Sequence, residues 1–134
     1  MITEDYVSFE LAKLLKEKGF DEEIETLITP EGKIYYVDQN SVSRACHTKI
    51  KNSDINIYSE DCSCPTLQMV MKWLREVHHL VVSVEYQVIC PTFKWRIYDM
   101  NSSDNKYTDF KHYDTYEEAC KQGIQYCLAL LIVK

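Results

Sequence analysis

Two cysteines separated by one residue, Cys62 and Cys64, are the positions in this chain whose type and spacing first suggest chemistry. Pro65 follows them directly and is typical of the first turn of a helix, where backbone N–H groups lack partners anyway. A helix that begins at Pro65 would place Cys64 at its cap, where the N–H groups and the macrodipole favour a reactive thiolate. Redox pairs of the thioredoxin kind have two intervening residues, and a single one strains a disulfide, so an incidental pair of loop thiols is the favoured interpretation.

A zinc site is the second chemistry to consider, because the chain holds several thiols and imidazoles. Zinc needs about four ligands in tetrahedral reach. No pair here has the usual C-x2-C or H-x3-H spacing, and two adjacent residues seldom reach one metal ion. We therefore expect no metal or other cofactor, and keep a thiol- or metal-dependent activity centred on Cys62 and Cys64 as the alternative. The residues that could supply ligands are Cys46, His47, Cys62, Cys64, His78 and His79.

His78 and His79 close a predicted helix, where a partly charged imidazole interacts favourably with the last carbonyl groups. Capping is therefore favoured over catalysis for both. A nucleophilic pair of Cys64 with His112 or His47 would need the fold to bring distant residues together, and no family signature flanks them. The three glycines are scattered, so no phosphate-binding loop is predicted. The sequence thus leans away from an enzyme.

The charge balance bears on nucleic acid as a partner. The chain carries 15 basic and 21 acidic residues, a net charge of −6. Affinity for nucleic acid rests on clustered Lys and Arg, so this balance makes such a partner an unfavoured one. A nucleic-acid-binding role stays as a further alternative through one local basic strip, formed by Lys49, Lys51, Lys94 and Arg96.

The aromatic residues point to a protein interface. Ten tyrosines and two tryptophans exceed what a small core comfortably buries. Rings with a polar tip are enriched where proteins bind one another, while their alternation along predicted strands supports core packing equally well. We take as candidate interface residues Tyr35, Tyr98, Tyr107, Tyr113 and Trp95.

Two helices that would position these residues are readable from the first part of the chain. Ser8 is a suitable N-cap for a helix that stops at Gly19. Residues 65–79 carry a stripe of apolar side chains at helical spacing and predict a second helix.

A third helix has the clearest start. Thr115 followed by Glu118 fits a capping box, with Asp114 as an alternative cap. Its small residues Ala119 and Gly123 should let another element approach closely, so we expect this helix to lie across a sheet.

Strands are predicted by period-two alternation and by turn residues. One hairpin is expected over residues 82–88 and 93–98, with a third strand at 107–110. A second hairpin is expected over residues 22–29 and 33–38, around a turn at Pro30 to Gly32. In the loop-like stretch 39–64, residues 55–58 predict one short edge strand. The face of the first hairpin strand that we expect to be buried carries Val82, Val84, Tyr86 and Val88.

Helices and hairpins come in blocks and not as alternating βαβ units, so the predicted fold class is α+β. We expect an antiparallel sheet of three to five strands with about three helices packed mainly on one face. A chain of 134 residues fits a single domain, residues 1–134. The longest strongly apolar run, 127–133, is shorter than the ~20 residues a membrane span needs, and the acidic start lacks a secretory signal. These features predict a cytoplasmic protein with reduced thiols and no membrane partner.

Four segments resemble a known group of sequences. They are SFELAKLLKEKGF (8–20), PTLQMVMKWLREVHH (65–79), WRIYD (95–99) and YDTYEEACKQGIQYCLALL (113–131). These segments, which occur in the same order along the chain, are similar to short hypothetical proteins of gut Bacteroides and of their phages or mobile elements. The resemblance implies a bacterial or phage origin and carries no catalytic residue to this chain.

The function expected from the sequence is therefore a non-enzymatic accessory or protein-interaction domain. It would act through contacts with a protein partner or as a homodimer, in which an aromatic cluster is buried across a two-fold axis.

Overall fold

The computed structural model describes residues 2–37, 49–102, 106–108 and 111–131. The chain forms two compact units. The short-strand unit is Tyr6–Pro65, and the long-hairpin unit joins residues 2–5 to Thr66–Leu131. Within the described residues, three α-helices and two three-stranded antiparallel sheets confirm the predicted α+β class. That the chain is a single domain stays a prediction.

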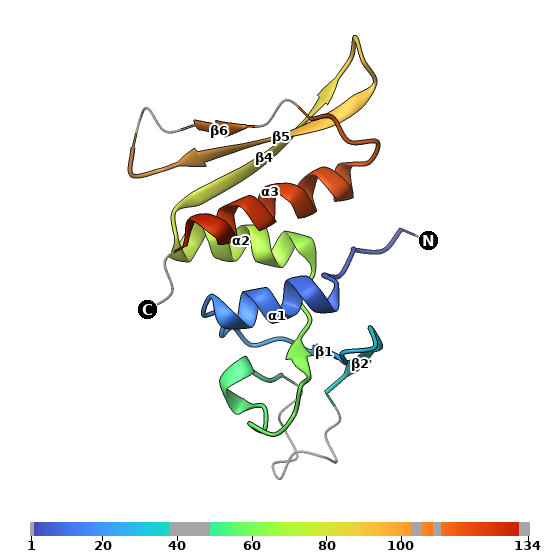
Figure 1. The fold of residues 1–134 in the computed structure, drawn as a ribbon, viewed down its shortest axis with the longest axis vertical. Coiled ribbons are helices and arrows are strands. Elements are labelled where there is room, and N and C mark those ends of the chain that lie inside the picture. Colours follow the sequence, from blue (N-terminus) through green and yellow to red (C-terminus); the bar gives the residue numbers. More distant parts are fainter. Residues whose placement is uncertain (1, 38–48, 103–105, 109–110, 132–134) are drawn as a thin grey trace. The chain divides into compact units, whose positions relative to one another are not determined.

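The long-hairpin unit is built around one extended hairpin. Its elements are α2 (Leu67–Val77), β4 (Leu80–Gln87), β5 (Thr92–Asp99), β6 (Lys106–Thr108) and α3 (Tyr116–Leu130). The sheet has the order β4-β5-β6, and α2 and α3 both lie on the same face of it (Figure 1). β4 and β5 pair along their full lengths, which confirms the hairpin that the alternation predicted. β6 supplies the expected third strand, although residues 109–110 of that prediction lie outside the described residues.

The start of α2 corrects one prediction. The N-cap is Thr66, whose Oγ1 accepts a hydrogen bond from the Met69 amide at 3.2 Å. Pro65 stands before the cap, and its carbonyl accepts a hydrogen bond from the Val7 amide at 3.1 Å. The predicted helix start at Pro65, with Cys64 at the cap, is therefore wrong, because a threonine hydroxyl satisfies the first-turn amide instead.

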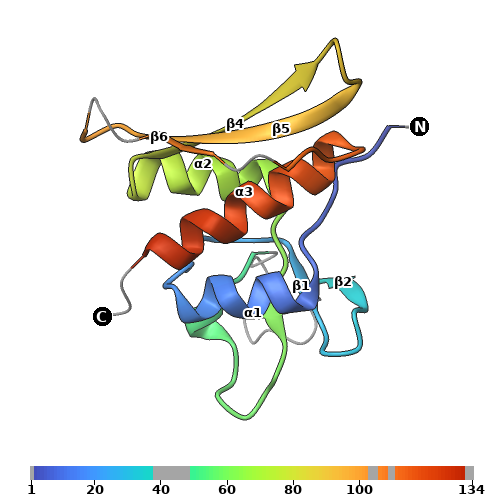
Figure 2. The same ribbon diagram turned by 45° about the horizontal axis from the view of Figure 1, so that its top comes forward.

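α3 begins and packs as predicted. Thr115 is the N-cap, and its Oγ1 accepts a hydrogen bond from the Glu118 amide at 3.1 Å. Gly123 lies against the hairpin: a Cβ added there would stand 2.9 Å from Val82 Cγ1 and 3.3 Å from Trp95 Cβ. The close approach expected at Gly123 is confirmed, and α3 lies across β4 and β5 because no side chain keeps it away (Figure 2).

The short-strand unit has less regular structure. Its elements are α1 (Phe9–Glu17), β1 (Thr26–Ile28), β2 (Ile34–Tyr36), the 3-10 helix η2 (Asn52–Asp54) and β3 (Cys62–Ser63). β1 is the central strand, with β2 and β3 antiparallel on its two sides, and α1 packs against β3. The hairpin predicted around the turn at residues 30–32 is confirmed with shorter strands, and α1 has its expected cap at Ser8 and stop at Gly19, whose φ is 91°.

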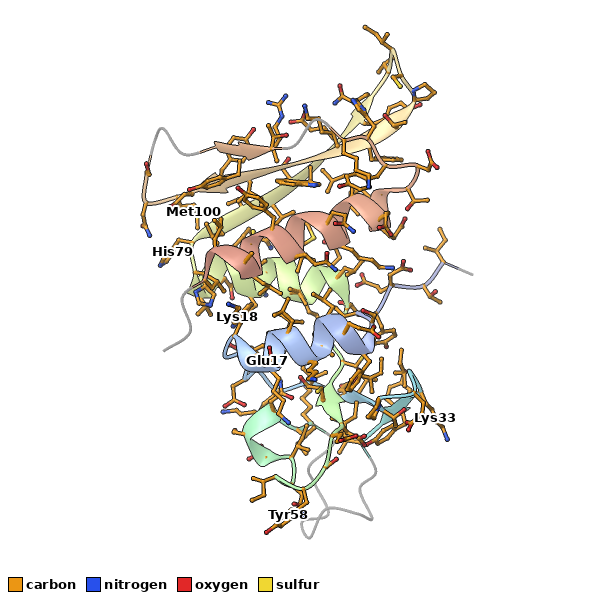
Figure 3. The ribbon with its side chains drawn as sticks, viewed as in Figure 1. Glu17, Lys18, Lys33, Tyr58, His79 and Met100 are labelled. Carbon is orange, nitrogen blue, oxygen red and sulfur yellow. The ribbon has the colours of Figure 1, made fainter. Side chains whose placement is uncertain are left out.

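The edge strand predicted at residues 55–58 is wrong. Asn56 forms a turn there: its Oδ1 accepts a hydrogen bond from the Tyr58 amide, and its carbonyl accepts one from the Ser59 amide, both at 2.9 Å. A local side-chain bond of this kind competes with strand pairing. Ile57 and Tyr58 are each 88% exposed, and Figure 3 shows Tyr58 at the outer end of its loop. Among the described residues of the stretch 39–64, the strand is instead β3, which no period-two alternation predicted.

Buried polar side chains connect the strands of this small sheet. Asn52 Nδ2 donates to the Phe20 carbonyl at 2.8 Å, and Asn52 Oδ1 accepts from the Ser63 amide at 3.0 Å. Thr26 Oγ1 donates to the Cys64 carbonyl at 2.6 Å. These bonds hold β3 beside β1 over a sequence separation of more than thirty residues.

None of the described helices is long and apolar enough to cross a membrane.

Candidate functional site

Cys62 and Cys64, the first candidates for chemistry, both lie buried in the short-strand unit. As residues i and i+2 around Ser63 they share one side of the chain at β3. The Cys62 thiol lies 3.7 Å from the Glu60 carbonyl, and the Cys64 thiol lies 3.5 Å from the Val7 carbonyl. Each thiol therefore lies within hydrogen-bond range of a backbone acceptor.

Burial opposes ionisation of both thiols. It raises the pKa of Cys64 to about 12, with a further contribution from Cys62. It also raises the pKa of Cys62, and Lys16 on α1 opposes that shift only in part. Because the thiolate is the nucleophile, burial lowers the reactivity of both thiols. The lowered pKa that a helix cap would give Cys64 is absent because Thr66 occupies the cap.

His78 is the C-cap residue of α2, as the sequence predicted. Its ring makes an edge-on contact with Trp73, with ring centroids 4.7 Å apart. Burial, and secondarily His79, lowers the pKa of His78, which disfavours the imidazolium form. The predicted contribution of a charged imidazole at this cap is therefore reduced.

His79 directly follows the C-cap residue of α2. Its φ of 58° places it in the left-handed region, where the chain turns from α2 into β4. Its carbonyl accepts a hydrogen bond from the Met100 amide at 2.9 Å, and the two residues lie side by side in Figure 3. His79 thus connects the helix end to the end of β5.

The structure describes only some of the other candidates for metal or nucleophilic chemistry. In the described ranges, no three His, Cys, Asp or Glu side chains are grouped so as to hold a metal ion. Cys46 and His47 lie outside those ranges. His112 is the histidine that the sequence offered as a possible partner of Cys64. Its Nδ1 lies 2.8 Å from Thr92 Oγ1.

The remaining described cysteines divide into core and surface. Cys120 and Cys127 are fully buried on α3. Burial raises the pKa of Cys120 to about 11 and that of Cys127 to about 12, which fits their predicted use as small core side chains. Cys90 is exposed at the end of the long hairpin.

The residues of the predicted basic strip come from both units. Lys94 and Arg96 share one face of β5, whereas Lys49 and Lys51 belong to the short-strand unit. Arg96 Nε lies 3.6 Å from the Glu85 carboxylate across the hairpin, so its charge is partly compensated.

The candidate interface rings of the long-hairpin unit are mostly core. Trp95 and Tyr113 are buried, which argues against surface contacts by either ring. Tyr107 is half-buried and packs on Tyr126, with centroids 5.6 Å apart. Tyr98 is half-buried and, by alternation with buried Trp95, lies on the sheet face away from the helices.

Tyr35 in the short-strand unit is also engaged. Its hydroxyl donates to the Asp61 carboxylate. Burial and the carboxylate together raise the pKa of Tyr35 to about 12. The ring is thus held in place between β2 and the approach to β3.

A surface feature that sequence reasoning missed is the outer edge of β4. Phe93 on β5 exchanges both backbone hydrogen bonds with Tyr113, at 2.7 and 2.8 Å. Odd-numbered residues of β5 therefore turn their N–H and C=O groups away from β4, and even-numbered ones turn them toward it. Since Arg96 faces Ser83, the odd-numbered residues of β4 are the ones bonded to β5.

The even-numbered residues of β4 consequently point their backbone groups outward. Among the described residues, none forms a backbone hydrogen bond to these groups, and β4 is the terminal strand of its sheet. The edge has no proline or lysine and one charged residue, Glu85, so it lacks the usual protection against strand pairing. The outward groups belong to Leu80, Val82, Val84 and Tyr86.

The hairpin end adds exposed apolar surface to this edge. Tyr86 is 54% and Val88 82% exposed, and Ile89 is fully exposed. The prediction that Tyr86 and Val88 continue the buried face of the strand is wrong, because the hairpin end bends away from α2 and α3 (Figures 1 and 2). Period-two alternation identified which face of the strand is buried, but not the residue at which α2 and α3 cease to cover that face.

A groove of about 320 Å³ lies at the starts of α2 and α3 in the same unit. Gln68 Nε2 donates to the Tyr116 hydroxyl at 3.3 Å there. Glu4, Asp5 and Glu117 line it as well. Carboxylates at helix starts are favoured by the helix dipoles, which accounts for them without a ligand.

Comparison with protein-family models, with curated proteins and with solved structures finds no match to this chain.

Proposed function

We propose that this chain is a non-enzymatic accessory or protein-interaction domain that binds a protein chain along the β4 edge of its long-hairpin unit. The observation that carries the proposal is the outer edge of β4, whose outward N–H and C=O groups adjoin exposed Tyr86 and Val88. Main-chain hydrogen bonds at such an edge supply affinity, and alternate side chains supply selectivity. The proposal includes a bacterial or phage origin and a cytoplasmic setting, which the five described free thiols accord with.

Two features support an interaction role over thiol chemistry. The two central candidates, Cys62 and Cys64, are buried with a raised pKa. The exposed apolar side chains of the hairpin end, by contrast, leave a surface that a partner could cover.

Site-specific photo-cross-linking in the host cell tests this proposal. A benzophenone amino acid at Val88 should give an adduct with a protein chain, either this one or another. The matched control is Ile57, which is 88% exposed but adjoins no strand edge. Adducts at Ile57 and none at Val88, or none at either position, would contradict the proposal.

A further inference from the structure

Resting on the proposed function, we infer that the partner at β4 is a second copy of this chain, paired antiparallel about a two-fold axis at Val84. Two features carry this inference: the outward backbone groups of β4, and a side-chain order that complements itself when the axis lies at Val84. The product would be a six-stranded sheet of order β6-β5-β4-β4-β5-β6.

The hydrogen-bond pattern fixes which residues can form bonded pairs. Only the even-numbered residues of β4 have their N–H and C=O groups on the free edge, as the pairing with β5 requires. With the axis at Val84, that residue bonds its own counterpart, and Val82 bonds Tyr86 of the second copy. Every bonded pair thus joins two outward-facing residues.

The side chains on the helix-covered face match in this register. Val84 faces Val84, and Val82 faces Tyr86 of the second copy, so aliphatic and aromatic groups meet directly. Beyond them, Leu80 comes beside Val88. Tyr86 and Val88, which are exposed in the single chain, would each gain an apolar neighbour.

The charges on the opposite face agree as well. Glu85, the one charged residue of β4, faces Ser83 of the second copy and not another carboxylate. An axis at Glu85 would place two carboxylates directly opposite, which is destabilising. An axis at Ser83 avoids that clash but pairs Val81 with Glu85, which leaves the carboxylate against an aliphatic side chain.

The symmetry has a consequence for the helices. A two-fold axis perpendicular to the sheet keeps α2 and α3 of both copies on the same face. Because α2 packs on β4, the two α2 helices would flank the axis.

Light scattering of the full chain from micromolar to millimolar concentration tests the inference. Wild type should pass from monomer to dimer. Ser83→Glu sets the introduced carboxylate of each copy against Glu85 of the other, and these two like-charge pairs should weaken dimerisation about tenfold. Ser83→Lys forms two opposite-charge pairs with Glu85 and should tighten it several-fold.

The same two variants control for the fold of the single chain. Ser83 faces Arg96 within the hairpin, so a carboxylate at this position favours the monomer and an ammonium disfavours it. The expected order of dimer affinity is thus the reverse of the expected order of monomer stability, which urea unfolding measures. The double variant Ser83→Glu with Glu85→Lys should restore dimerisation.

Several outcomes would overturn the inference. A monomer at every concentration is one, and equal weakening by both Ser83 variants, which indicates an axis at Ser83, is another. No response to either variant is a third, because Ser83 would then not face Glu85 of a second copy. If Val88 cross-links only to a different protein, the second-copy inference fails while the proposed function stands.

Discussion

The two described sheets of this chain each have three strands, but different interactions hold those strands together. In the long-hairpin unit, β4 and β5 are eight residues long and adjacent in sequence, and α3 covers them through the close approach at Gly123. In the short-strand unit none of the described strands exceeds three residues, and β1 meets β3 across a long stretch of chain. The first sheet therefore rests on local pairing and apolar cover.

The second sheet depends on polar groups inside the unit. Asn52 bonds to both Phe20 and Ser63, and Thr26 bonds to the Cys64 carbonyl. A buried polar group that loses its partner costs more than the net value of its bond. Short strands can therefore pair over a long sequence separation when buried side chains add hydrogen bonds to those between the strand backbones.

Asn52, at the polar centre of the short-strand unit, is the residue whose substitution should lower the free energy of unfolding most. Asn52→Leu leaves the Phe20 carbonyl and the Ser63 amide without their partner, so we expect a loss of about 2–4 kcal/mol in unfolding free energy. Urea unfolding measures it. Asn56→Leu is the matched control, because Asn56 is exposed and bonds only within its own turn, and its loss should be well below half as large.

The next effect compares the buried thiols of the two units. Burial raises the pKa of Cys64 and of Cys127 to about 12, from near 9 in the unfolded chain. Their stabilisation is therefore complete below pH 9 and is lost as pH rises toward 12, because the unfolded state releases protons first. In that window Cys64→Ala or Cys127→Ala should reduce the pH slope of unfolding free energy by about 1.4 kcal/mol per pH unit.

Urea titrations at about pH 10 and about pH 11, both between the unfolded-state and folded-state pKa values, give the slope for each variant. Cys90→Ala, which changes an exposed thiol, should leave it unaltered. An unchanged slope in the Cys64 or Cys127 variant would mean that the thiol is ionised in the folded chain.

Gly123→Ala tests the close packing of α3 on the hairpin in the long-hairpin unit. The added methyl group meets Val82 Cγ1 at 2.9 Å, while the helix gains the better propensity of alanine. We expect overpacking to prevail, with a net loss of about 1 kcal/mol by thermal or urea unfolding. Gln125→Ala, at an exposed position of the same helix, should change little; a stabilised Gly123 variant would show that α3 and the hairpin can separate without cost.

These variants also test the prediction of a single domain. If the two units unfold together, Asn52→Leu and Gly123→Ala shift one common transition, seen by circular dichroism and by tryptophan fluorescence alike. Both tryptophans lie in the long-hairpin unit, so fluorescence reports that unit alone. A fluorescence transition unmoved by Asn52→Leu would divide the chain into two domains.

The smallest effect compares two helix ends. Gly19 after α1 and His79 after α2 both have positive φ, but only glycine adopts it without strain. His79→Gly should therefore raise unfolding free energy by about 1 kcal/mol, and Gly19→Ala should lower it by about the same amount. Melting temperatures of the two variants check the opposite signs, and a destabilised His79→Gly variant would assign the His79 side chain a contact that outweighs the strain.

Short-range patterns predicted most of the long-hairpin unit. The alternation over residues 82–88 and 93–98 gave the hairpin, and Thr115 and Gly123 gave the start and the packing of α3. These features depend on neighbours in sequence, so a single chain displays them. The same patterns could not locate the free edge of β4, because which strand is terminal depends on the order of strands in space.

The fold class, the three helices and both hairpins were predictable because caps, turns and apolar periodicity act over a few residues. Three features became visible only in the folded chain: Thr66 and not Cys64 caps α2, β3 pairs with β1, and Tyr86 and Val88 extend beyond the helices that cover the sheet. Each of these depends on which distant groups compete for one hydrogen bond or one surface, and that competition is settled only when the chain is folded.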